Sequence, residues 1–167
     1  MTTKSLDLGC GPKPKNPYNA TEVYGIDVRD DADAQVVRAD LVVEPIPFPD
    51  NSFDFVTAHD FLEHIPRLIY APHRRNAFVE VMNEIHRVLK PNGILMSFTP
   101  AFPHGPTFRD PTHVNFITEE TFPLYFDNTH RWASSYGFKG AFDVLSQEWR
   151  GVHLLSQLRK TVPVVNA

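Results

Sequence analysis

Short stretches containing apolar residues alternate with turn-forming segments along the first hundred residues. Residues 4–8, 23–28 and 35–39 each contain apolar positions, and each ends at or beside a glycine or an acidic residue. Residues 53–58 are mostly apolar, which is typical of a central strand buried on both faces. Residues 93–99 have a similar composition. We expect a strand at each of these five positions.

One longer segment has the period of a helix. Between Arg75 and Leu89, apolar residues recur three or four positions apart, which places them on one helical face. The residues on this face are Phe78, Val81, Met82, Ile85, Val88 and Leu89. A lysine followed by Pro-Asn-Gly, residues 90–93, ends the predicted helix. Residues 59–65 are expected to form a short helical turn or loop.

The last third of the chain predicts one more helix and two more strands. Thr118 is a suitable cap for a helix that runs toward Tyr136, although Pro123 lies early in it. Residues 142–149 alternate as a strand does, and residues 152–158 are expected to be its antiparallel neighbour.

Strands that alternate with helices predict an α/β fold. We expect a Rossmann-like, doubly wound and mostly parallel sheet with antiparallel C-terminal strands, arranged as a three-layer sandwich. Only residues 12–22 join the first glycine turn to the second strand, and three of them are prolines. The first helix is therefore expected to be shortened or missing. The 167 residues fit a single domain, 1–167.

Composition and charge narrow the range of partners. The formal net charge of −4 provides no broad basic surface, so nucleic acid is not expected as the main partner. The single cysteine, Cys10, cannot form an internal disulfide and is interpreted as a small buried filler. No apolar run approaches the roughly 20 residues that a membrane-spanning helix needs. A cytoplasmic location without membrane attachment is expected.

The strand ends predict a binding site for an adenosine-containing cofactor. In a doubly wound sheet, ligands bind beyond the carboxyl ends of the strands. Gly9 and Gly11 would let the backbone pass close to a ligand because glycine has no Cβ. Asp27, at the end of the second strand, could accept hydrogen bonds from a ribose. These three residues suit a nicotinamide cofactor and S-adenosylmethionine equally well.

The segment after the glycines separates the two cofactors. A dinucleotide is held by the N-terminus of the helix that follows the glycine turn, and residues 12–22 leave little room for that helix. The third glycine of the dinucleotide fingerprint would fall at position 14, which is Pro14. S-adenosylmethionine carries no phosphate, so the sequence favours it over NAD.

Several segments resemble those of class I S-adenosylmethionine-dependent methyltransferases, in particular the small-molecule branch known as type 11. The resemblance covers roughly residues 4–150 in order. It is carried by Asp7-Leu8-Gly9-Cys10-Gly11, Gly25-Ile26-Asp27, residues 46–54, Leu62-Glu63-His64-Ile65, residues 84–95, residues 113–118 and Tyr136-Gly137-Phe138.

The resemblance implies a role for each cofactor-binding position. Gly9 and Gly11 would contact the methionine part of the cofactor through their backbone. Asp7 would orient the glycine turn or the cofactor's ammonium group, and Asp27 would hold the ribose hydroxyls. His59 would lie against the methionine moiety.

Two further positions complete the expected cofactor site. The resemblance implies that Asp40 accepts a hydrogen bond from the adenine amino group and that the Leu41 N–H donates to the adenine ring. No metal is expected. His59, Asp60, Glu63 and His64 are close in sequence, but they lack the His-Glu-x-x-His order of zinc proteases, and packing or helix capping is expected of Glu63 and His64.

Methyl transfer is an in-line displacement at an activated sulfonium carbon, so positioning and desolvation supply much of the acceleration. A general base is needed when the acceptor carries a proton that must leave. His59, His104 and His113 are candidates because imidazole accepts a proton near neutral pH. His113 and His59 rank first.

The sequence thus predicts an S-adenosylmethionine-dependent methyltransferase acting on a small-molecule acceptor. An NAD-linked oxidoreductase is one alternative. A non-catalytic module that binds S-adenosylmethionine or a partner protein is another. Because no helix precedes the first strand, a homodimer or a lid supplied by a partner would serve to cover the cofactor.

Overall fold

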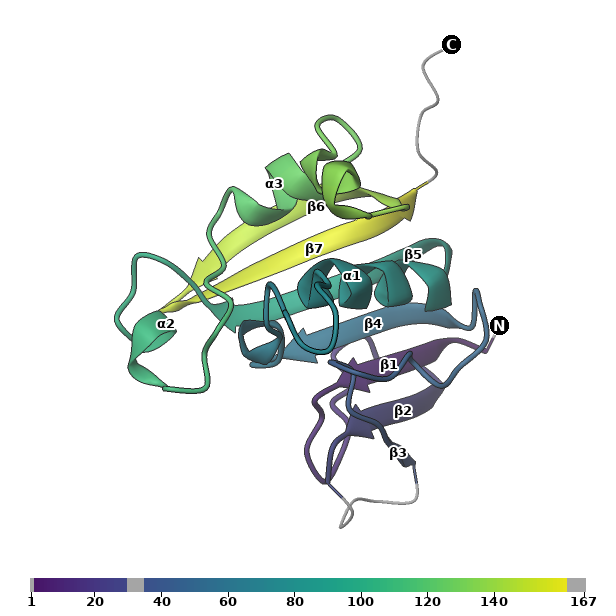
Figure 1. The fold of residues 1–167 in the computed structure, drawn as a ribbon. Helices are drawn as coiled ribbons and strands as arrows, with labels where there is room; N and C mark the ends of the chain where they lie inside the picture. The colour runs from purple at the N-terminus through teal and green to yellow at the C-terminus, as the bar shows by residue number, and fades with distance from the viewer. Residues whose placement is uncertain (1, 30–34, 162–167) are drawn as a thin grey trace.

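Seven strands form one mixed sheet in the order β3-β2-β1-β4-β5-β7-β6 (Figure 1). The computed structural model describes residues 2–29 and 35–161. Neighbouring strands from β3 to β5 are parallel, whereas β7 is antiparallel to both β5 and β6. The strands are β1 (Lys4–Leu8), β2 (Glu22–Asp27), β3 (Val36–Arg38), β4 (Phe53–His59), β5 (Leu89–Pro100), β6 (Ala141–Arg150) and β7 (His153–Thr161). The predicted Rossmann-like sheet with antiparallel C-terminal strands is confirmed.

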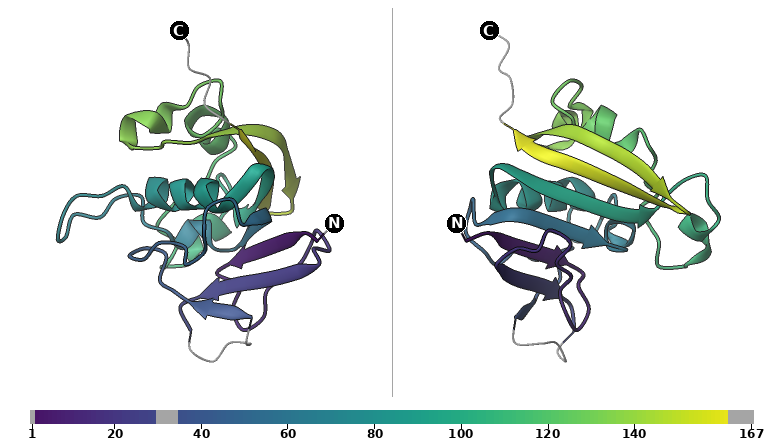
Figure 2. Two further views of the ribbon diagram at one scale, coloured as in Figure 1. Left: turned by 90° about the vertical axis from the view of Figure 1, so that its right-hand side faces the viewer. Right: turned by 180° about the vertical axis from the view of Figure 1, so that it is seen from behind.

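The helices are short apart from one. They are the 3-10 helices η1 (Leu62–His64) and η2 (Trp132–Tyr136) and the α-helices α1 (Ala77–Val88), α2 (Pro106–Arg109) and α3 (Thr121–Tyr125). Figures 1 and 2 show that α1, α3 and η2 lie on the same face of the sheet.

The core lies between that face and α1. Leu6 of β1 is directly opposite Val56 of β4, which is in turn opposite Leu95 of β5. Residues opposite each other on paired strands point to the same side, so these three side chains form a continuous apolar row. All three are fully buried, as are Met82 and Ile85 of the predicted helical face. The apolar face of the strands and the apolar face of α1 therefore pack together in one core.

A loop covers part of the opposite face. Residues 9–21 contain no helix, as the prolines predicted. The ring of Tyr18 stacks on Phe55 of β4 at 4.3 Å between centroids, with the rings 5° from parallel. Phe55 is next to Val56 in the strand and therefore points to the face away from α1. In this part of the third layer, a loop takes the place of a helix.

The predicted helix from Thr118 toward Tyr136 is wrong, because two short helices with a turn between them occupy this segment. Asp127 lies in the turn and its carboxylate accepts the N–H groups of Thr129 at 2.8 Å and Val144 at 2.9 Å. Arg131 has a φ of 49°, which a helix does not accommodate. The carboxylate of Asp127 thus bonds to its own turn and to strand β6, and the chain leaves the helical path after α3.

Other boundaries differ by a few residues. β5 begins at Leu89, four residues before the predicted strand, because α1 ends at Val88 and Leu89 is already extended. β2 lies one residue earlier than the predicted range, and β3 is one residue shorter than predicted at each end. The antiparallel pairing of β6 and β7 is confirmed.

Arg87 fastens the proline-rich loop before β4 to α1. Its guanidinium donates to the carbonyl oxygens of Ile46 and Phe48, both at 2.8 Å, and pairs with Glu84 at 2.7 Å. Glu84 also accepts the Ile46 N–H at 3.0 Å. The two charged residues therefore supply hydrogen bonds to a loop that has few regular partners of its own.

Among the helices of residues 2–29 and 35–161, none is long and apolar enough to cross a membrane. The cytoplasmic location and the single-domain organisation stay predictions.

Candidate cofactor and active site

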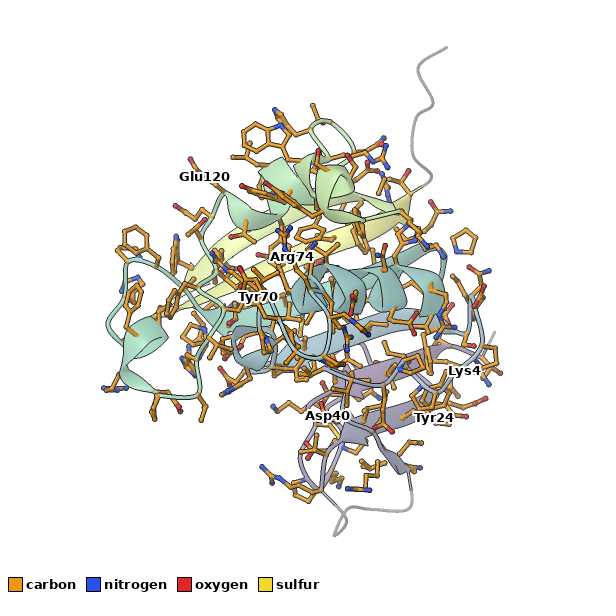
Figure 3. The ribbon with its side chains drawn as sticks, viewed as in Figure 1. Lys4, Tyr24, Asp40, Tyr70, Arg74 and Glu120 are labelled. Atoms are coloured by element: carbon orange, nitrogen blue, oxygen red, sulfur yellow. The ribbon has the colours of Figure 1, made fainter. Side chains whose placement is uncertain are left out.

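The carboxyl ends of four parallel strands bring the expected site residues to one edge of the sheet. β1 ends before Gly9, β2 ends at Asp27 and β4 ends at His59. Asp40 follows β3 and lies at this same edge, where the arrow of β2 ends in Figure 3. The predicted positions are therefore neighbours in space although they span more than fifty residues of sequence.

The two glycines of the turn have different surroundings. Both have the positive φ values that favour glycine, 62° for Gly9 and 65° for Gly11. A Cβ on Gly9 would lie 2.5 Å from Cδ2 of Phe61, so the space beside Gly9 is used by that ring. Among the described residues, a Cβ on Gly11 would have only Arg29 Nη1 within 4 Å, at 3.8 Å. Gly11 is therefore the glycine that a ligand can approach closely.

Asp27 holds the glycine turn to β2. Its Oδ2 accepts the Gly11 N–H at 2.7 Å, and its Oδ1 accepts the Arg29 N–H at 3.1 Å. The guanidinium of Arg29, which is mostly exposed, lies 3.5 Å from Oδ1. Each carboxylate oxygen can accept two hydrogen bonds, so Oδ2 retains a lone pair. Sequence reasoning assigned only the ribose to Asp27 and missed its bond to Gly11.

Asp7 joins three segments and is 1% exposed. Its Oδ2 accepts the Lys15 N–H at 2.9 Å, which anchors the loop after the glycine turn. Its Oδ1 accepts the Thr57 hydroxyl at 2.6 Å and lies 3.3 Å from Nδ1 of His59. Of the two roles expected of Asp7, this arrangement supports orientation of the glycine turn.

The bond to Asp7 fixes how the His59 ring is used. A carboxylate accepts hydrogen bonds, so in the neutral ring Nδ1 carries the hydrogen and Nε2 has the free lone pair. The side chain of His59 is 15% exposed. His59 therefore presents a basic nitrogen at the carboxyl end of β4.

Asp40 and Leu41 form a turn beyond β3. Asp40 is exposed, and its Oδ1 accepts the Val42 N–H at 3.0 Å. Its carbonyl oxygen accepts the Glu44 N–H at 2.8 Å. Leu41 is buried. The pair offers a carboxylate to solvent and an apolar side chain to the core, next to the end of β3.

The other two candidate bases have different partners. His104 packs edge-on against Trp149, with 4.9 Å between ring centroids. His113 packs edge-on against His64 at 4.8 Å. Neither makes the contact with Asp7 that orients His59.

Glu63 is a buried acid that the sequence analysis expected only to pack or cap. It is fully buried, and its Oε2 accepts the Thr99 hydroxyl at 2.8 Å. Burial raises the pKa of the Glu63 carboxyl. Sequence reasoning could not place Thr99 and His113 beside it, because both are more than thirty residues away in the chain.

A cavity of about 560 Å³ lies between α1, α3 and η2. Its apolar wall includes the side chains of Phe78, Tyr125, Phe126, Trp132 and Tyr136. Arg74, from the loop before α1, and Glu120, just before α3, are charged residues at its rim, and Figure 3 labels both together with the neighbouring, exposed Tyr70. The size and aromatic lining suit a flat organic molecule.

The strand order, the glycine turn and the acid at the end of β2 define a Rossmann-like protein that binds an adenosine-containing cofactor. The sequence profile of the family described as "Methyltransferase domain" matches residues 6–97. The chain belongs to this family, and its fold is that of the class I S-adenosylmethionine-dependent methyltransferases.

Curated relatives include two enzymes named demethylmenaquinone methyltransferase. One from Staphylococcus saprophyticus is 27% identical, and one from Listeria monocytogenes is 34% identical. Each match covers 64% of this chain and 48% of the relative, so the chain spans about half the length of these relatives.

A solved structure supports the fold assignment. An S-adenosylmethionine-dependent methyltransferase from Methanosarcina mazei has a TM-score of 0.61 at 17% identity, over 96% of this chain and 93% of its own. S-adenosylmethionine is the cofactor of this family, which argues against the NAD-linked alternative.

The residues at the sheet edge fit that cofactor. Gly11 has open space where a Cβ would stand, and Asp27 Oδ2 keeps a lone pair within the site. The exposed carboxylate of Asp40 lies at the same edge, next to the end of β3, where an adenine amino group could donate to it. Phe61 fills the place where a Cβ of Gly9 would stand, so the open space beside the glycine turn lies at Gly11.

Proposed function

We propose that this chain transfers the methyl group of S-adenosylmethionine to a small-molecule acceptor. The observation that carries the proposal is the arrangement at one sheet edge of an open glycine, a carboxylate at the end of β2 and a histidine oriented by a buried acid. These are Gly11, Asp27 and His59.

The cofactor would be held along this edge. When bound, S-adenosylmethionine supplies an electrophilic methyl group on sulfur. Gly11 would allow its methionine part to lie against the backbone, Asp27 would accept from the ribose, and Asp40 with the Leu41 N–H would recognise the adenine. Binding of the acceptor would exclude water from this edge.

His59 is the proposed general base. Its Nε2 takes the proton that the acceptor loses, and the imidazolium that forms is stabilised by the Asp7 carboxylate at Nδ1. Asp7 is a positioning residue, because it acts through the histidine ring and fixes its tautomer.

The aromatic cavity is the proposed acceptor site. Asn115 lines this cavity and donates from its side-chain amide to the carbonyl oxygen of Leu62 at 3.0 Å. Leu62 follows Phe61, which packs on Gly9. The cavity is thus connected to the glycine turn through the contact of Asn115 with Leu62 and that of Phe61 with Gly9. The name of the relatives, which act on demethylmenaquinone, supports a flat and largely apolar acceptor.

Calorimetry with S-adenosylhomocysteine and with NAD tests the cofactor assignment. We expect one-to-one binding of S-adenosylhomocysteine and none of NAD. Binding of NAD alone would reject the proposal.

A transfer assay with labelled S-adenosylmethionine and hydroxylated aromatic acceptors tests turnover. We expect His59→Gln to lower the rate at least about 100-fold with little change in S-adenosylhomocysteine affinity. Tight cofactor binding without transfer to any acceptor would instead favour the non-catalytic module.

A further inference from the structure

We propose that Glu63, His64 and His113 form a binding site for a divalent transition-metal ion. The ligand atoms of the three side chains lie within 4.8 Å of one another. Glu63 and His64 come from η1, just past the end of β4, and His113 comes from the loop after α2. One carboxylate and two imidazoles are a donor set that zinc, manganese and iron accept.

Glu63 provides an acceptor atom with no other use. Its Oε1 is buried and has no hydrogen-bond partner among the described residues, while Oε2 is occupied by Thr99. A buried carboxylate oxygen without a partner costs free energy, and a bound cation would satisfy it.

The hydrogen bonds of the two histidines leave Nε2 of each ring available to a metal. Nδ1 of His64 lies 3.1 Å from the hydroxyl oxygen of Thr112, which itself donates to Asp110, and 3.3 Å from the carbonyl oxygen of Thr112. Nδ1 of His113 lies 3.3 Å from the carbonyl oxygen of Thr107. A carbonyl oxygen can only accept, so each Nδ1 carries a hydrogen and each Nε2 keeps its lone pair. Metal-bound histidines in proteins commonly donate their second ring nitrogen in this way.

Backbone hydrogen bonds hold the segment that carries His113 against η1, which carries Glu63 and His64. The N–H groups of Val114 and Asn115 both donate to the carbonyl oxygen of Glu63, at 2.9 and 3.0 Å. The segment that carries His113 is therefore tied directly to the residue that carries the carboxylate. The donor atoms, which lie within 4.8 Å of one another, need to approach by up to about 1.4 Å to reach the roughly 3.4 Å separation of tetrahedral zinc ligands.

A neighbouring acid and a cavity leave room for further ligands. Oδ2 of Asp110 is 3.9 Å from Nε2 of His113, while its Oδ1 is used by Thr112. Asp60, Glu63, His64, Asp110 and His113 line a cavity of about 620 Å³. An ion held by three residues would keep positions open toward this cavity for Asp110, water or an oxygen of another molecule.

Calorimetry and Mn²⁺ electron paramagnetic resonance test the site without any need for activity. After treatment with EDTA, we expect the protein to bind one equivalent of Zn²⁺ or Mn²⁺ and to prefer both over Mg²⁺ and Ca²⁺. His64→Gln and His113→Gln should each weaken binding at least about tenfold. His130→Gln is the control, because His130 is exposed and contacts Trp132.

Circular dichroism shows whether each histidine variant folds. No stoichiometric binding by the wild type, or unchanged affinity in both folded histidine variants, would overturn the proposal. S-adenosylhomocysteine binding, measured on the same samples, separates this outcome from failure of the methyltransferase proposal.

Discussion

Two carboxylates in this protein, those of Asp7 and Asp27, each accept hydrogen bonds from a segment distant from their own strand. Asp7 joins the loop after the glycine turn to β4, and Asp27 joins the glycine turn to β2. A buried carboxylate is stabilised when several donors share it. The same bonds place the functional atoms of Gly11 and His59, so structural and functional roles are combined in these side chains.

Replacement of Asp27 tests its ribose contact. Asp27→Asn keeps the size of the side chain but removes its charge, and we expect S-adenosylhomocysteine binding to weaken by about 1–2 kcal/mol. Calorimetry measures the effect. Asp143→Asn is a matched control, because Asp143, on the distant strand β6, pairs with Arg159 of β7 and its replacement should leave the affinity unchanged. Equal affinities in wild type and Asp27→Asn would remove Asp27 from the site.

At the scale of elements, close packing of a loop replaces a helix. Cys10 and Pro14, from the loop after β1, lie against Gly25 of β2 at distances that leave no room for a Cβ. Burial raises the pKa of the Cys10 thiol to about 11, so this side chain is an uncharged packing group at neutral pH. A glycine at position 25 is what lets a loop this short lie flat on the strand.

Gly25→Ala should therefore lower the free energy of unfolding by about 1–3 kcal/mol, as overpacking does. Urea denaturation measures the loss. The double variant Gly25→Ala/Cys10→Ala should recover part of it, because the smaller residue makes room. Gly105→Ala should change little, because a Cβ there meets none of the residues that the structure describes within 4 Å. A loss of the same size at Gly105 would show that the effect at Gly25 is not one of packing.

The link between α1 and the proline-rich loop is open to a similar test. Arg87→Met removes the hydrogen bonds to Ile46 and Phe48, and we expect a loss of about 2 kcal/mol in unfolding free energy. Arg150→Met is the comparison, because Arg150 is exposed and its ion pair among the described residues is with the exposed Glu148. Thermal melts of both variants should show a clear fall in Tm for Arg87→Met alone. Similar melting temperatures would mean that the loop does not depend on Arg87.

At the scale of the whole molecule, α1 is joined to the far strands through His86. Its Nε2 lies 3.1 Å from the carbonyl oxygen of Thr161, and its ring packs edge-on against Phe142 at 5.3 Å. Burial is the largest influence on this group and lowers its pKa from the ordinary value of 6.5. The folded protein therefore holds His86 in its neutral form.

This environment predicts a loss of stability in mild acid. Above pH 6.5 the ring is neutral in the folded and unfolded chains, so stability does not depend on it. As the pH falls below this value, the unfolded chain takes up a proton that the folded protein resists, and stability declines. Denaturation between pH 7.5 and 5 should show a steeper fall for the wild type than for His86→Gln. An equal decline of stability with pH in the wild type and in His86→Gln would show that His86 is not the group responsible.

Sequence reasoning recovered the parts of the fold that depend on local pattern. The strands and α1 have strong periodicity, and the prolines after Gly11 showed that a helix is missing there. It failed between residues 118 and 136, because Asp127 bonds to Val144 on a strand that follows later in the chain. The partners of Asp7 and Glu63 were equally out of reach, since these contacts join segments more than thirty residues apart.

The ion pair between Arg29 and Asp27 leaves one oxygen of the carboxylate available to the cofactor's sugar. The guanidinium lies against Oδ1, whereas Oδ2 keeps a lone pair, so a ribose can bond to Asp27 without displacing Arg29. The attraction between the two charges weakens as ionic strength increases, but the uncharged sugar bonds to the other oxygen. Added salt should therefore change occupancy at this position little, in contrast to its effect on ligands that are attracted by charge.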